Sequence, residues 1–81
     1  MRILIIEDEL PARAKLEEML KKLQPDTRVI AQLGSVKDSL EWLKANDHPD
    51  VAFVDIQLSD DHSFEIFRKC DVRFPVIFTT A

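Results

Sequence analysis

A chain of 81 residues has room for one small domain, and its 46% hydrophobic and 32% charged residues are typical of a globular protein rather than a disordered one. The formal net charge of −4 argues against a nucleic-acid-binding surface, because phosphate binding requires clustered Lys and Arg. The single cysteine, Cys70, excludes an internal disulfide and fits a reducing, cytoplasmic compartment. The apolar run near the N-terminus, residues 3–6, is too short for a secretory signal or a membrane span.

The first element expected is a buried strand, followed by an amphipathic helix. Residues 3–6 (ILII) form a continuous β-favouring apolar run, which is typical of a strand covered on both faces of a parallel sheet. Pro11 suits the first turn of a helix, and Pro25 lies just beyond its end. The apolar residues of this helix recur at helical spacing: Leu16, Met19, Leu20 and Leu23.

A second strand and helix follow. Residues 28–33 (RVIAQL) predict the strand, which Gly34 ends. Ser35 with Asp38 three positions later resembles a capping box that opens the helix. The residues of this helix expected to point inward are Val36, Leu40 and Leu43.

The last third of the chain predicts strand, helix and strand. Residues 51–54 (VAFV) form a third apolar strand, and Asp55 stands at its carboxyl end. A polar loop, residues 59–63, leads to a short helix, and residues 75–80 (PVIFTT) predict a fourth strand. Strictly alternating strands and helices indicate a parallel sheet joined by right-handed crossovers, the doubly wound α/β class. In that class, ligands bind beyond the carboxyl ends of the strands.

Three carboxylates fall at that edge of the predicted sheet. Glu7 and Asp8 follow the first strand and Asp55 ends the third, so the three converge if those strands are neighbours. Like charges resist ionisation when they are gathered, and a hard cation with oxygen ligands offsets this cost. Mg²⁺ is the usual ion where a phosphoryl group shares the site. Thr79 and Thr80 add hydroxyl groups at the same edge.

Structural roles for the same acids remain open at this point. The acidic run at residues 7–9 suits the start of a helix, and Asp55 suits a turn. Neither role requires an acid pair after one strand and a lone acid after the next but one. Cys70 is interpreted as a half-buried core residue, and His48 as a surface turn residue. His62 lacks a second nitrogen ligand, so it is weak evidence for a metal.

Three motifs together resemble the response-regulator receiver domains of bacterial two-component signalling. They are IIEDE after the first strand, FVDIQLSD around the third, and PVIFTTA at the fourth. The sequence around Asp55 and the C-terminal motif PVIFTTA resemble receivers of the LytTR transcription-factor class in particular. The resemblance covers residues 1–81 and implies a CheY-like sheet with strand order 2-1-3-4.

The resemblance also implies a role for each matching residue. Asp55 is expected to be the phosphoacceptor, and Thr80 the hydroxyl that turns toward the phosphoryl group. Mg²⁺ is expected to bind Asp8 and Asp55 together with the backbone carbonyl of Gln57, and Glu7 is expected to hold it directly or through water. A sensor histidine kinase is the expected donor. Such a module is expected to assist its own aspartyl phosphorylation and dephosphorylation but not to be a metabolic enzyme.

The chain also departs from the family pattern. Ser59 and Ser63 stand where many receivers have Pro and Gly, and Asp61 where relatives often have Gly. The family's fifth strand, the lysine it carries and the last two helices have no counterpart in residues 1–81. We therefore expect a partial receiver with weakened phosphorylation, an open sheet edge and a tendency to form homodimers or swapped dimers.

Three other functions compete with a phosphoacceptor role. A truncated or degenerate receiver would act only as a protein–protein interaction or dimerisation module. A flavodoxin-like cofactor site is disfavoured because acids at residues 7–9 would repel a phosphate. A phosphatase with an Asp nucleophile after the first strand is disfavoured because the EDE run lacks DxD spacing. DNA binding would come only from a missing output domain.

Overall fold

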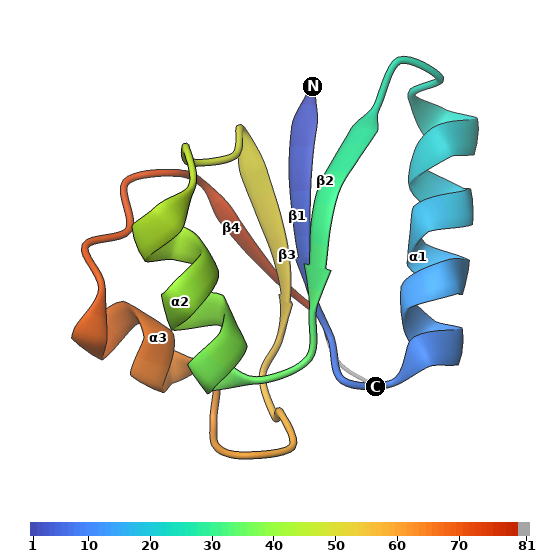
Figure 1. The fold of residues 1–81 in the computed structure, drawn as a ribbon. Coiled ribbons are helices and arrows are strands. Elements are labelled where there is room, and N and C mark those ends of the chain that lie inside the picture. The colour runs from blue at the N-terminus through green and yellow to red at the C-terminus, as the bar shows by residue number, and fades with distance from the viewer. Residues whose placement is uncertain (80–81) are drawn as a thin grey trace.

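The computed structural model describes residues 1–79, in which strands and helices alternate along the chain (Figure 1). Each predicted element is present. The bounds are β1 Arg2–Ile6, α1 Leu10–Leu23, β2 Arg28–Leu33, α2 Val36–Ala45, β3 Val51–Asp55, α3 Phe64–Lys69 and β4 Val76–Thr79.

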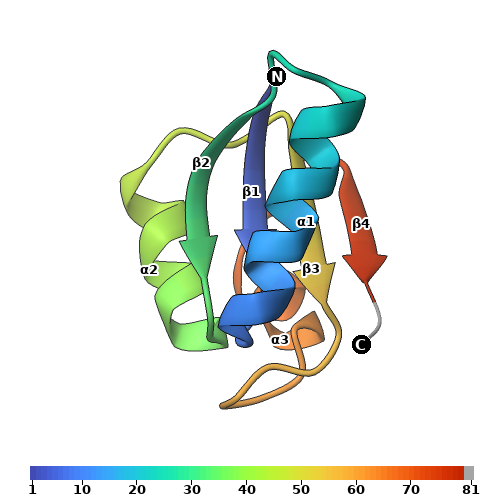
Figure 2. The same ribbon diagram turned by 90° about the vertical axis from the view of Figure 1, so that its right-hand side faces the viewer.

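The four strands form one parallel sheet in the order β2-β1-β3-β4, which confirms the predicted doubly wound order. All arrowheads point to the same end of the sheet in Figure 2. The register pairs Ile6 of β1 with Leu33 of β2 on one side and with Val54 of β3 on the other. On the other side of β3, Asp55 pairs with Thr79 of β4. The carboxyl ends of the strands therefore lie in one row.

Side chains alternate between the two faces of the sheet, as the pleat of a strand requires. Leu4 and Ile6 of β1 point to the face that α2 and α3 cover, where the larger core cluster lies. Ile3 and Ile5 point to the opposite face, where Leu16 and Leu20 of α1 pack against them. The ILII run has no polar position because both faces of β1 are covered.

Helix α1 is less deeply packed than its sequence pattern predicts. Leu16 and Leu20 contact the sheet, but Met19 is 51% exposed and Leu23 is 77% exposed. In residues 1–79, α1 is the only helix on its face of the sheet (Figure 1), so its apolar stripe is wider than the surface it covers. The predicted amphipathic helix is present, but two of its four spaced apolar residues are largely exposed.

Helix α2 is well capped and closely packed. Ser35 Oγ accepts a hydrogen bond of 3.0 Å from the Asp38 main-chain N–H, which confirms the serine half of the predicted capping box. Val36 and Leu43 are 5% exposed, and Leu40 packs against the same core cluster. Helix α1 begins differently, because its N-cap residue Glu9 makes no side-chain capping bond and Pro11 occupies the first turn.

Ile66 anchors α3 to the sheet, and its truncation tests that packing. The side chain is fully buried in the larger core cluster, so Ile66→Ala leaves a cavity and is expected to lower the free energy of unfolding by about 2–5 kcal/mol. Urea unfolding followed by circular dichroism measures the change. Ile77→Ala is the matched control, because Ile77 is 48% exposed and its loss should cost well under about 1.5 kcal/mol. Equal costs for the two variants would contradict the packing described here.

Candidate metal and phosphoryl-acceptor site

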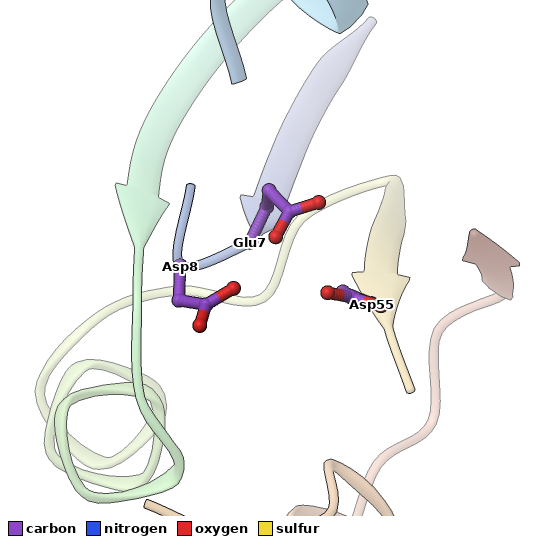
Figure 3. A group of neighbouring side chains, drawn as sticks. All are labelled: Glu7, Asp8 and Asp55. Atoms are coloured by element: carbon purple, nitrogen blue, oxygen red, sulfur yellow. The ribbon is translucent and has the colours of Figure 1, made fainter. Parts of the chain in front are cut away.

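Glu7, Asp8 and Asp55 converge at the carboxyl edge of the sheet. Glu7 and Asp8 follow β1 directly, and Asp55 is the last residue of the neighbouring β3. One carboxylate oxygen from each residue lies within 4.8 Å of the others. The carboxyl groups of Asp8 and Asp55 point toward one another across the gap between the strand ends, with the carboxyl group of Glu7 beside them (Figure 3). The predicted convergence of these acids is confirmed.

Main-chain bonds and one arginine fix the turn that carries Glu7 and Asp8. The Glu7 main-chain N–H donates to the Leu33 carbonyl at 2.8 Å, which continues the β1–β2 ladder into the turn. Arg13 Nε donates to the Glu7 carbonyl at 2.5 Å, so the first turns of α1 hold the loop from the other side. Sequence reasoning missed Arg13. Its only signal is a basic residue placed one helical turn after an acidic run.

Burial raises the pKa of Glu7 from 4.5 to about 7. The side chain is 8% exposed, so removal of water from the charged form is the main cause. The Glu9 main-chain N–H donates to Glu7 Oε2 at 3.3 Å and opposes the rise, whereas neighbouring Asp8 and Asp55 reinforce it. Asp55 is also buried, at 7% exposed. The cluster therefore has a carboxylate that resists ionisation near neutral pH.

The donor set fits a small divalent cation. Mg²⁺ prefers oxygen ligands and takes few carboxylates from a protein, and three carboxylates within reach of one point satisfy that preference. Burial is the main cause of the raised pKa of Glu7, and a cation among the carboxylates would offset it by stabilising the ionised form. The chemistry of these residues therefore fits Mg²⁺.

The loop between β3 and α3 forms a closed turn next to Asp55. The Ser63 main-chain N–H donates to the Ile56 carbonyl at 2.8 Å, and the Leu58 N–H donates to the Asp61 carbonyl at 3.0 Å. Gln57 and His62 form an isolated antiparallel β-bridge across this turn. Leu58 is 2% exposed and reaches into the core. Gln57 thus stands two positions after Asp55, in a turn whose shape is fixed by its own hydrogen bonds.

The other residues singled out from the sequence fall in different places. Thr79 is the register partner of Asp55 and lines, with Glu7 and Lys15, a hollow of about 390 Å³ between α1 and the sheet. Thr80 lies outside the described residues. His62 is exposed and is not part of the carboxylate cluster. Cys70 is half-buried against the core, and His48 is exposed, as expected.

A larger hollow lies away from the carboxylates. It has a volume of about 670 Å³ and lies between α3 and β4, where Phe67, Cys70, Phe74 and Phe78 contribute to its lining. It brings together no group of carboxylates. The chemistry therefore points to the smaller, acidic edge rather than to the larger hollow. None of the helices in residues 1–79 is long and apolar enough to cross a membrane.

Comparisons with known proteins agree with this geometry. The family model for the response regulator receiver domain matches residues 3–81. The chain is 37% identical to the sensory transduction protein LytT of Bacillus anthracis and 29% identical to that of Bacillus subtilis (strain 168). Both alignments cover 100% of this chain, but the chain spans only about a third of those relatives, 33% and 34%.

Solved receiver structures share the fold. The response regulator MaeR bound to beryllium trifluoride has a TM-score of 0.83 at 24% identity, over 100% of this chain and 67% of that one. The receiver domain of Erythrobacter litoralis PhyR has a TM-score of 0.74 at 30% identity, over 99% and 62%. Sheet order, acidic edge and family match point to one assignment. The chain belongs to the response regulator receiver domain family, with LytT-type sensory transduction proteins among its relatives.

Proposed function

We propose that this chain accepts a phosphoryl group on Asp55, with Mg²⁺ held by Glu7, Asp8 and Asp55. The observation that carries the proposal is the convergence of three carboxylates within 4.8 Å at the carboxyl edge of a parallel sheet. A receiver of a two-component system takes its phosphoryl group from a sensor histidine kinase, which we propose as the partner. The cytoplasm is the compartment we propose for that exchange.

The residues have separate tasks in this reaction. An Asp55 carboxylate oxygen attacks the phosphorus, and the bond from phosphorus to the donor's nitrogen or oxygen breaks as the new O–P bond forms. Bound Mg²⁺ would neutralise charge on the transferring oxygens. Glu7 and Asp8 would hold the ion, and the Gln57 carbonyl would complete the protein ligands. Thr80 is proposed to bond the phosphoryl group afterwards and so report the modification.

The direct test is the intact mass of the chain after incubation with acetyl phosphate and Mg²⁺. A mass increase of one phosphoryl group, which disappears when Mg²⁺ is removed with a chelator, supports the proposal. No increase at any Mg²⁺ concentration would instead favour a receiver that acts only through protein–protein contacts. In neither case is the module a metabolic enzyme. DNA binding would belong to an output domain rather than to this acidic segment.

Self-association through the edge strand β4 is a separate expectation. Within residues 1–79, β4 lies at the end of the sheet order, and Ile77 and Phe78 on it are 48% and 41% exposed. An exposed apolar edge strand pairs readily with a second copy, so we expect a dimer at high protein concentration. Sedimentation velocity should show this dimer, and Ile77→Lys should shift the chain toward monomer. Met19→Lys, the same kind of change on α1, is the control. A wild-type monomer at high concentration would contradict this expectation.

A further inference from the structure

Asp60 caps the start of α2 from a distant loop. The Val36 main-chain N–H donates to Asp60 Oδ1 at 2.8 Å, and the Lys37 N–H donates to Oδ2 at 3.1 Å. Val36 and Lys37 are the first two residues of α2, so their N–H groups have no partner within the helix. The two bonds hold the pKa of Asp60 below its usual range, the bond from Val36 being the larger cause. The capping carboxylate is therefore charged at neutral pH.

The same residue belongs to the loop that follows the phosphoacceptor strand. Asp60 lies at the tip of the closed turn between Ile56 and Ser63, whose hydrogen bonds fix its shape. Leu58 anchors the turn in the core on one side of Asp60. Gln57 belongs to the same closed turn and stands two positions after Asp55.

The start of α2 also lies next to the turn that carries Glu7 and Asp8. Ser59 Oγ donates to the Gly34 carbonyl at 3.3 Å, a second link between the loop and the end of β2. Gly34 in turn packs on that turn, because a Cβ atom built on it would lie 3.6 Å from the Asp8 Cα. The hydrogen bonds of Asp60 and Ser59 therefore join the loop that carries Gln57 to the segment next to Asp8. Figure 1 shows this loop and the start of α2 at the same edge of the sheet.

We propose that Asp60 is a positioning residue, which holds the β3–α3 loop against the start of α2 and so restrains Gln57, whose carbonyl is a proposed Mg²⁺ ligand. This inference rests on the proposed function, because it assigns to Asp60 a part in shaping that same site. Asp60 touches neither the ion nor the phosphoryl group.

The test compares Asp60→Ala with Ser35→Ala. Each variant removes side-chain capping bonds from the start of α2, but Ser35 Oγ bonds only within the α2 cap and Asp60 also restrains the loop. We expect Asp60→Ala to weaken Mg²⁺ binding about tenfold in isothermal titration calorimetry, as losses of outer-shell partners do. Ser35→Ala should lower the melting temperature as well yet leave Mg²⁺ affinity within about twofold. Asp60→Asn, which keeps one acceptor oxygen, should fall between wild type and Asp60→Ala.

Amide hydrogen exchange without metal supplies a second readout. Asp60→Ala should speed exchange at the Leu58 and Ser63 amides, which close the loop, whereas Ser35→Ala should not. Equal Mg²⁺ affinity in wild type and Asp60→Ala, or equal losses in the Ala variants, would overturn the proposal. A wild-type chain that binds no Mg²⁺ would refute the metal site itself. The exchange rates would then still show whether Asp60 restrains the β3–α3 loop or only caps α2.

Discussion

Asp55→Asn is expected to abolish phosphorylation of this chain by acetyl phosphate. Asparagine has the same shape as aspartate, but its neutral amide is not a nucleophile toward phosphorus. Asp55 is 7% exposed, and its carboxyl group faces that of Asp8 within the carboxylate cluster. Intact-mass measurement after incubation with Mg²⁺ should show the wild type modified and the variant unmodified.

The control for this experiment is Asp26→Asn. Asp26 lies just before β2, at the amino edge of the sheet and opposite the carboxylate cluster, so the same chemical change there should leave phosphorylation at the wild-type level. The Asp55→Asn variant should remain folded, because removing one charge from three gathered carboxylates lowers their repulsion. A phosphorylated, folded Asp55→Asn protein would refute the assignment of the acceptor.

Glu7→Gln is expected to stabilise the metal-free chain at pH 8 and to reduce the stabilisation that Mg²⁺ gives. The folded state raises the pKa of Glu7 from 4.5 to about 7, so it holds the proton more tightly than the unfolded chain does. Stability is therefore lost as the pH rises between these two values, by at most about 3 kcal/mol. Glutamine imitates the protonated carboxyl group and escapes that loss. It also gives up a charged oxygen ligand for the ion.

Thermal unfolding at pH 5 and pH 8, with and without Mg²⁺, measures both effects. The difference in stability between Glu7→Gln and wild type should be small at pH 5 and should favour the variant at pH 8. Mg²⁺ should stabilise the wild type more at pH 8 than at pH 5, because binding requires the ionised carboxylate. A difference that does not change with pH would contradict the shifted pKa of Glu7.

Much of the fold was predictable because its local and long-range signals agree. The ILII and VAFV runs are apolar at every position, which is typical of strands covered on both faces. Ser35 was predictable as a cap because its partner lies three residues away. The convergence of Glu7, Asp8 and Asp55 followed from parallel strands ending at one edge. The roles assigned to these acids, to Gln57 and to Thr80 remain proposals.

What the sequence did not predict depends on contacts between distant segments. Asp60 was predicted only as part of a polar loop, yet it bonds main-chain groups 24 and 23 positions away. Arg13 was not considered, although it holds the Glu7 carbonyl. The exposure of Met19 and Leu23 depends on how many helices cover the face of α1, which the helical spacing of one segment does not encode.

The placement of Trp42 gives this chain an intrinsic optical reporter. Trp42 is the one tryptophan and there is no tyrosine, so indole emission arises from a single position on α2. The ring is half-buried and packs against the larger core cluster, on the helix whose first amides bond Asp60. Its emission maximum and quenching by iodide therefore monitor the helix next to the acidic edge without any attached dye.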